Sequence, residues 1–210
     1  MKKEAIDKKL IDVDVSAKIQ DTIDVFNTNN EKTEEAIVTA FKKFPCNTSV
    51  SEVLIKVILV NEIYHTRIKS KDLLQVATHI SEIKGLDQWL KVGDEEAYQQ
   101  IANTPAGLDN IYSFASKYCS FSNPDKYPIV DKFARCVLRA IGQNEDFKEL
   151  QKTTAYSSLL SGNNVKYSEY RETINAFIAL VKKKCNEKYS YKDIDKFLWQ
   201  YGVDNNIANE

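Results

Sequence analysis

Apolar side chains recur every three or four residues along most of the chain, which is the period of a helix with one buried face. The most apolar stretch, residues 50–63 (VSEVLIKVILVNEI), is apolar almost all round and predicts a buried central helix. Thr48 and Ser49 precede it as capping candidates, and Glu52 stands where a capping box requires an acid. We therefore expect an all-helical protein.

Polar and turn-forming residues divide the rest of the chain into further helices. Asn27-Thr28-Asn29-Asn30 is expected to end the first helical region, and Pro45 to end the second. Alternating β-branched runs are scarce, so a sandwich or a barrel is not expected. Helices are predicted at residues 2–27, 31–44, 71–84, 86–90, 94–103, 111–119, 147–150, 168–185 and 193–201, and another opens at Asp131.

The residues before Asp131 form a junction between two of these helices. Pro124 and Pro128 exclude one continuous helix, because proline has no N–H and disfavours helical geometry in the residue before it. Asp131 falls at or near a helix N-terminus, where a carboxylate caps unpaired N–H groups and the helix dipole favours its charge. Residue type and position alone predict an N-cap.

The cysteine and histidine content argues against a metal centre. The cysteines have no CxxC spacing and the chain has only two histidines, so we predict no zinc or iron–sulfur site and no cofactor. We expect free thiols in a reducing compartment, and hence a cytoplasmic protein. The basic start lacks the apolar core of a signal segment, and no run approaches the roughly 18 apolar residues of a membrane span. The cysteines are Cys46, Cys119, Cys136 and Cys185.

Charge is nearly balanced overall but uneven along the chain. The net charge of −1 differs from the basic character of most nucleic-acid-binding proteins. Residues 112–140, however, carry five cations against two acids, Asp125 and Asp131. The run Lys182-Lys183-Lys184 is typical of a solvated helix end, which cations stabilise through the helix dipole. These patches permit a polyanionic partner without requiring one.

Several short stretches, taken in order, resemble one known family. Thr104-Pro105-Ala106-Gly107-Leu108 has the composition of a hairpin turn, residues 111–119 form an apolar helix, and Pro128-Ile129-Val130-Asp131 follows a loop. This order resembles the helix-hairpin-helix DNA glycosylase superfamily, which includes endonuclease III and 8-oxoguanine glycosylases and in which a Pro-Val-Asp element begins the next helix. Residues 61–68 (NEIYHTRI) and 195–202 (DKFLWQYG) are similar to the glycosylase-fold proteins nearest to 8-oxoguanine glycosylase.

This resemblance implies a fold and a domain organisation. It covers residues 48–202 and implies an all-α, glycosylase-like fold in which two interlocked helical subdomains enclose a cleft. Residues 1–47 are then the N-terminal helices of a single glycosylase-like unit, and residues 203–210 are a frayed tail. The hairpin lacks the second glycine of the family pattern, and Pro-Ile-Val-Asp is one residue longer than Pro-Val-Asp.

The resemblance also implies an activity, namely hydrolysis of the N-glycosidic bond of a damaged or modified base in double-stranded DNA by a monomer. Cleavage builds positive charge on the deoxyribose, so a fixed carboxylate stabilises the oxocarbenium-like transition state and orients the attacking water. Asp131 is the candidate for this role. Bifunctional members carry a Schiff-base lysine at the start of the helix after the hairpin, where this chain has Tyr112 or Ser113, with Lys117 about one turn later. We therefore expect a glycosylase without lyase activity.

The same resemblance suggests which residues contact DNA once the base is flipped out of the duplex. The candidates for the base pocket or for filling the gap are Asn61, Tyr64, His65, Tyr112 and Ser113. The candidates for contacts with the DNA backbone are Gly107, Lys117, Lys132 and Arg135.

Two other interpretations stay open. A non-catalytic DNA-binding module of the same fold is favoured by the absent lysine, the altered hairpin and the near-zero net charge. An all-helical protein-interaction adaptor would be favoured if no positive face existed around Lys117, Lys132, Arg135 and the lysine run at 182–184. The sequence also leaves open which base is removed, and whether the role is repair or defence against phage DNA.

Overall fold

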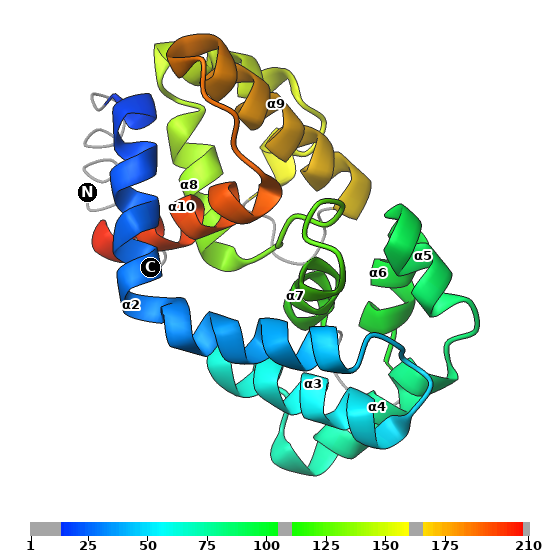
Figure 1. Ribbon diagram of the computed structural model, residues 1–210. Coiled ribbons are helices and arrows are strands. Elements are labelled where there is room, and N and C mark those ends of the chain that lie inside the picture. The colour runs from blue at the N-terminus through cyan, green and yellow to red at the C-terminus, as the bar shows by residue number, and fades with distance from the viewer. Residues whose placement is uncertain (1–13, 105–110, 160–165, 208–210) are drawn as a thin grey trace. The chain divides into compact units, whose positions relative to one another are not determined.

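The computed structural model describes residues 14–104, 111–159 and 166–207. In these ranges the regular elements are α-helices and short 3-10 helices, with no strand (Figure 1). The predicted all-α class is confirmed for this part of the chain. None of the helices in the described ranges is both long enough and apolar enough to cross a membrane.

The chain divides into two compact units. The central unit is residues 30–129, and the terminal unit joins residues 1–29 to residues 130–210. The Pro-containing loop before Asp131 therefore contains one of the two boundaries between the units. The other boundary lies inside the first described helix.

That helix, α2 (Val15–Lys43), runs through the stretch that was expected to break it. The predicted end at Asn27-Thr28-Asn29-Asn30 is wrong. Threonine hydroxyls satisfy main-chain carbonyls within the helix, with Thr28 Oγ1 donating to Asp24 O over 2.9 Å and Thr33 Oγ1 to Asn30 O over 2.8 Å. Asparagine costs a helix less than about 1 kcal/mol per residue, so buried apolar residues on both sides, such as Ile23 and Ile37, decide the outcome.

The central unit is built from α3 (Val50–Tyr64), α4 (Leu73–Glu82), α5 (Leu86–Val92), α6 (Glu95–Ala102), α7 (Tyr112–Ser122) and the end of α2. Its interior is formed by side chains that are completely buried, among them Val53, Val57, Val60, Val76, Ile80, Ile101, Phe114 and Tyr118. The predicted core helix at residues 50–63 matches α3, which packs along α4 (Figure 1).

In the central unit one predicted helix cap and one predicted helix start differ from the structure. Ser49 is the N-cap of α3, but its side chain makes no capping bond, so the capping box with Glu52 is not formed. Ser49 Oγ lies 3.2 Å from Ser51 Oγ instead. The next helix starts at Leu73 rather than at residue 71, because a 3-10 turn, η1 (Ser70–Asp72), precedes it.

The terminal unit consists of the start of α2, α8 (Lys132–Ile141), the 3-10 segments η2 (Glu145–Lys152) and η3 (Tyr156–Ser158), α9 (Tyr167–Cys185) and α10 (Tyr191–Asp204). The lysine run at 182–184 lies exposed in the last turn of α9, as predicted. The capping box of α10 was not predicted. Ser190 Oγ and the side chain of Asp193 each satisfy the other residue's N–H, so α10 begins two residues before the predicted start at 193.

In the terminal unit, α10 packs closely against α8, the helix that begins after Asp131. A Cβ on Gly202 of α10 would lie 2.9 Å from the Phe133 ring and 3.2 Å from Val137 of α8. Only glycine allows the two helices to pack at this separation. The adjacent Trp199 makes edge-on ring contacts with Phe133 and with Phe26 of α2, so the three helices share one apolar centre.

Candidate functional site

Asp131 is the N-cap of α8, as the sequence predicted. Its backbone is extended, with φ −137° and ψ 175°, and its Oδ1 accepts a hydrogen bond from the N–H of Ala134 over 2.8 Å. The side chain is partly exposed. Pro124 and Pro128 both lie outside helices, between the end of α7 and the start of α8. The carboxylate is held at a helix N-terminus by a local bond and retains contact with solvent.

A buried tyrosine shares the electrostatic environment of Asp131. Tyr170 of α9 is fully buried, and burial raises its pKa well above the ordinary value of a phenol. The negative charges of Asp131 and Asp195 raise this pKa further, while Arg135 lowers it. The phenol therefore stays protonated at neutral pH beside the α8 N-terminus.

The two DNA-backbone candidates on α8 differ in how they are held. Lys132 is exposed. Arg135 is half-buried, and its guanidinium donates to two main-chain carbonyls, Nε to Asp131 O and Nη1 to Leu159 O, each over 3.3 Å. Arg135 thus ties the first turn of α8 to residue 159.

In the central unit, the loop after α3 is organised by the side chain of Asn61. This residue is 6% exposed. Its Oδ1 accepts from Thr66 Oγ1 over 2.7 Å and from the N–H of Ile68 over 3.0 Å, and its Nδ2 donates to Ile68 O over 3.1 Å. Asn61 therefore braces the loop from within.

The braced loop holds two exposed basic residues in a left-handed conformation. His65 has φ 48° and Arg67 has φ 68°, backbone angles that residues other than glycine rarely adopt. Such backbone strain persists where the surroundings enforce it, and it is concentrated at binding sites. His65 was predicted as a contact residue, whereas Arg67 was missed even though it lies in the same NEIYHTRI stretch.

Three further candidates meet in the central unit. The Lys117 ammonium donates to Ser113 Oγ over 2.9 Å and lies 5.6 Å from the centre of the Tyr64 ring. The Tyr64 hydroxyl in turn donates to Glu34 Oε1 over 2.6 Å, and Glu34 was not among the predicted site residues. Lys117 is only 3% exposed, so its charge lies against protein groups.

Two predicted site residues, Tyr112 and Gly107, stand near the start of α7 in the sequence. Tyr112 stacks on Tyr98 of α6, with ring centroids 6.3 Å apart and planes inclined by 30°. Gly107, in the predicted hairpin, lies outside the described residues.

A buried lysine that the sequence analysis did not single out forms a second polar cluster in the central unit. Lys56 of α3 is 1% exposed, and its ammonium donates to Phe44 O over 3.0 Å, Cys46 O over 3.1 Å and Asn47 Oδ1 over 2.7 Å. Burial lowers the pKa of Lys56 to about 8, against the opposing effect of Asp87 and Glu52. The signal available in the sequence was a single cation in the middle of an otherwise apolar helix.

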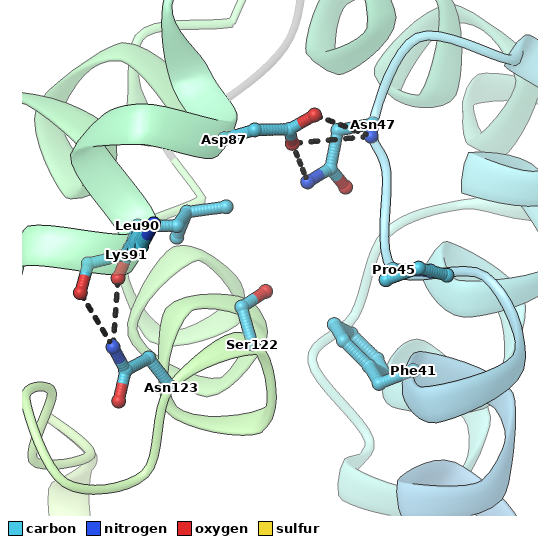
Figure 2. Close-up of a pocket in the computed structure, with 8 residues that line it drawn as sticks. All are labelled: Phe41, Pro45, Asn47, Asp87, Leu90, Lys91, Ser122 and Asn123. Atoms are coloured by element: carbon cyan, nitrogen blue, oxygen red, sulfur yellow. Dashed lines mark hydrogen bonds between the residues drawn. The ribbon is translucent and has the colours of Figure 1, made fainter.

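Asn47, one residue of the Lys56 cluster, also lines a pocket with a volume of about 270 Å³ (Figure 2). Asn47 joins the two, because its Oδ1 faces Lys56 while its main-chain N–H and Nδ2 donate to Asp87. The pocket lies wholly within the central unit. It is lined by Phe41, Pro45, Asn47, Asp87, Leu90, Lys91, Ser122 and Asn123.

No group of three or more histidine, cysteine, aspartate or glutamate residues with metal-binding geometry occurs in the described ranges. All four cysteines, one of which is the exposed Cys46, are free thiols.

Together these features define an all-helical protein with a capped carboxylate in one unit and a basic loop and a polar pocket in the other. The chain belongs to the HI_0787_N family, whose model, described as an N-terminal domain, matches residues 14–126. A protein of Haemophilus influenzae that is named only as an uncharacterized protein is 30% identical over 158 residues, which are 74% of this chain and 69% of that protein. No solved structure matches the chain.

The family match has a definite extent on the fold. It runs from the start of α2 to the end of α7 and includes the Asn61 loop and the Lys56 cluster. It ends before Asp131. Neither the description of the family nor the name of the relative states an activity.

Proposed function

We propose that the protein is a monofunctional DNA glycosylase with a helix-hairpin-helix glycosylase-like fold, which acts as a cytoplasmic monomer on a damaged or modified base in double-stranded DNA. The observation that carries the proposal is the Asp131 carboxylate. It is partly exposed at the first turn of α8, directly after a Pro-containing loop, and its Oδ1 is fixed by the N–H of Ala134 at 2.8 Å. This setting agrees with the resemblance around Pro128-Ile129-Val130-Asp131.

Asp131 would act through its charge. Departure of the base leaves positive charge on the sugar, and a carboxylate held in place before the reaction stabilises that charge without reorganising. The same group can orient or deprotonate the attacking water. Lys132, the next residue, is exposed at this helix end, where a cation would contact a backbone phosphate and hold the strand.

The loop after α3 would act on the duplex. Extruding a base costs a few kcal/mol of stacking and pairing energy, and side chains that fill the gap offset part of that cost. His65 and Arg67 are exposed on a strained loop that Asn61 braces, so their positions are set before DNA binds. Asn61 would support this contact rather than make it.

Water is the proposed nucleophile because no exposed lysine stands at the start of α7. Ser113 occupies that place, and the Lys117 ammonium one turn later is 3% exposed and donates to the Ser113 hydroxyl. A hydrolytic reaction leaves an intact abasic site.

A non-catalytic DNA-binding module is the second candidate. It is favoured by the burial of Lys117, which leaves no exposed lysine nucleophile on α7, while the exposed His65 and Arg67 would still contact DNA. A protein-interaction adaptor is favoured by exposed apolar residues on α3 and α4, namely Ile55, Ile58 and Leu74, which are 42%, 39% and 56% exposed.

The test is base release from a panel of modified duplex oligonucleotides and phage genomic DNA, with abasic sites detected as strand breaks after alkali treatment. The decisive variant is Asp131→Asn, because asparagine is as good an N-cap as aspartate and removes only the charge. Glu82→Gln, which removes a carboxylate charge from an exposed residue of the other unit, is the matched control. We expect breaks with the wild type and the control and none with Asp131→Asn. Activity of Asp131→Asn near the wild-type level would overturn the role of Asp131. No breaks on any substrate, together with salt-sensitive DNA binding, would favour the binding module.

A further inference from the structure

The pocket in the central unit has the features of a binding site that the glycosylase proposal does not use. Its volume of about 270 Å³ lies just below the usual range for drug-sized ligands of about 300–1,000 Å³, so it suits a smaller molecule. It combines an apolar side, formed by Phe41, Pro45 and Leu90, with a polar side that carries the Asp87 carboxylate (Figure 2).

Asp87 is oriented by Asn47, whose side chain lies between this carboxylate and the Lys56 ammonium. The main-chain N–H of Asn47 donates to Asp87 Oδ1 over 3.1 Å, and Asn47 Nδ2 donates to the same oxygen over 2.6 Å. Within the described ranges, no cation lies within ion-pair distance of Asp87, although Lys91 follows one turn later on α5. The carboxylate therefore lines the pocket in a direction that Asn47 fixes.

The residue that orients Asp87 is itself held from behind. Asn47 Oδ1 accepts from the buried Lys56 ammonium over 2.7 Å and also from the Tyr118 hydroxyl. Burying an ammonium group is costly, so a buried lysine is retained where its hydrogen bonds fix something of use. Here the fixed element is the amide that positions Asp87.

Ser122 supplies a second acceptor in the pocket lining. Ser122 Oγ donates to Tyr118 O over 2.9 Å, which leaves its oxygen lone pairs directed away from that bond. Asn123 Nδ2 donates to the carbonyls of Leu90 and Lys91, each over 3.0 Å, and joins the end of α7 to α5. The wall between Ser122 and Leu90 is therefore rigid.

We infer that this pocket binds a small organic cation, a primary ammonium or guanidinium group on a short aliphatic stem. The cationic head would donate to Asp87 and to Ser122 Oγ, and the stem would lie against Phe41, Pro45 and Leu90. The inference involves no residue of the proposed DNA site, so either proposal can fail while the other holds.

The test is a titration of the full-length protein with n-butylamine and agmatine, followed by the backbone amide signals of the pocket residues in NMR spectra. n-Butanol, which has the same stem without a charge, is the control ligand. We expect the amines to shift the signals of residues 47, 87 and 122, with binding weakened by added salt, and n-butanol to bind at least about tenfold more weakly.

Variants of the protein distinguish amine binding in the pocket from non-specific attraction of amines to the acidic residues of the surface. Asp87→Asn keeps an acceptor for Asn47 and removes the charge, and we expect it to weaken amine binding about tenfold or more. Ser122→Ala, which leaves the Asn47 contacts alone, should weaken it about twofold to tenfold. Glu82→Gln, an exposed acid outside the pocket, is the matched control and should bind as the wild type does. Equal binding of butylamine and butanol, wild-type affinity of Asp87→Asn, or no shift at about 10 mM amine would overturn the inference, because even a Kd of about 1 mM would be visible there.

Discussion

The Lys117 ammonium donates to the hydroxyl of Ser113, one helical turn earlier on α7, over 2.9 Å. Lysine at position i+4 reaches back toward residue i because helical side chains lean toward the N-terminus. The only lysine of α7 is thereby engaged at the place where the resembled bifunctional enzymes carry their nucleophile. It is buried there against the Tyr64 ring.

We predict that no covalent enzyme–DNA adduct forms through Lys117. Attack on the sugar requires an exposed, neutral amine, whereas this group is 3% exposed and donates to Ser113. Borohydride added during base release should trap no adduct, as judged by gel mobility, while alkali still reveals abasic sites. A trapped band that disappears in Lys117→Met would show that Lys117 is the nucleophile and that the protein is bifunctional.

The capping role of Asp131 can be separated from its proposed chemistry by stability alone. Asp131→Ala removes the acceptor of the Ala134 N–H and should lower the free energy of unfolding by about 0.5–2 kcal/mol. Asp131→Asn keeps a capping acceptor and should change it by less than about 0.5 kcal/mol. Urea denaturation measures both. Equal stability of the wild type and Asp131→Ala would mean that the cap contributes nothing.

The start of α8 was predictable because its determinants are local. Pro124, Pro128 and Asp131 lie within eight residues, and each acts on the backbone next to it. The continuity of α2 was not predictable from the same kind of signal. The asparagines at 27, 29 and 30 favour a break only weakly, and long-range packing of the flanking apolar residues overrides them.

The Lys56 cluster was harder to foresee because its residues are distant in sequence. Asn47 and Asp87 are 40 residues apart, and Tyr118 is 71 residues from Asn47, so no spacing rule connects them. Arg67 was missed for another reason. Its left-handed backbone is enforced by the side chain of Asn61 rather than by a glycine, so the usual sequence marker of that conformation is absent.

Asn61 should contribute strongly to stability. Asn61→Ala leaves the buried N–H and C=O of Ile68 without their side-chain partner, and each such group costs about 1–3 kcal/mol. We expect a loss of about 2–4 kcal/mol in the free energy of unfolding, measured in urea. Thr66→Val, which removes one hydroxyl bond to the same amide, should lose only about 0.5–1.5 kcal/mol. Comparable losses in the two variants would argue against Asn61 as the central brace.

Gly202 offers a test of the α8–α10 contact that supports the Asp131 helix. The Cβ of Gly202→Ala would lie 2.9 Å from the Phe133 ring, and overpacking of this kind costs about 1–3 kcal/mol. The double variant Gly202→Ala, Phe133→Leu should recover part of this loss, because the smaller side chain makes room. Thermal unfolding of the single and double variants measures the coupling. No recovery in the double variant would place the strain elsewhere in α10.

The lowered pKa of the buried Lys56 predicts that the free energy of unfolding depends on pH above neutrality. Its pKa of about 8 in the folded protein lies below the value of 10.5 for a free side chain, so the unfolded chain binds the proton more tightly. The contribution of Lys56 to the free energy of unfolding should therefore rise as the pH increases from about 8 toward 10.5, by a total on the order of 3 kcal/mol, with no change below about pH 7. Other groups titrate in the same range, so the relevant quantity is the difference between the wild type and Lys56→Met in urea unfolding from pH 7 to 10. That difference should grow in favour of the wild type with increasing pH. A constant difference would show that the ammonium is stabilised by its three acceptors as well as it is by water, and that its burial does not lower its pKa.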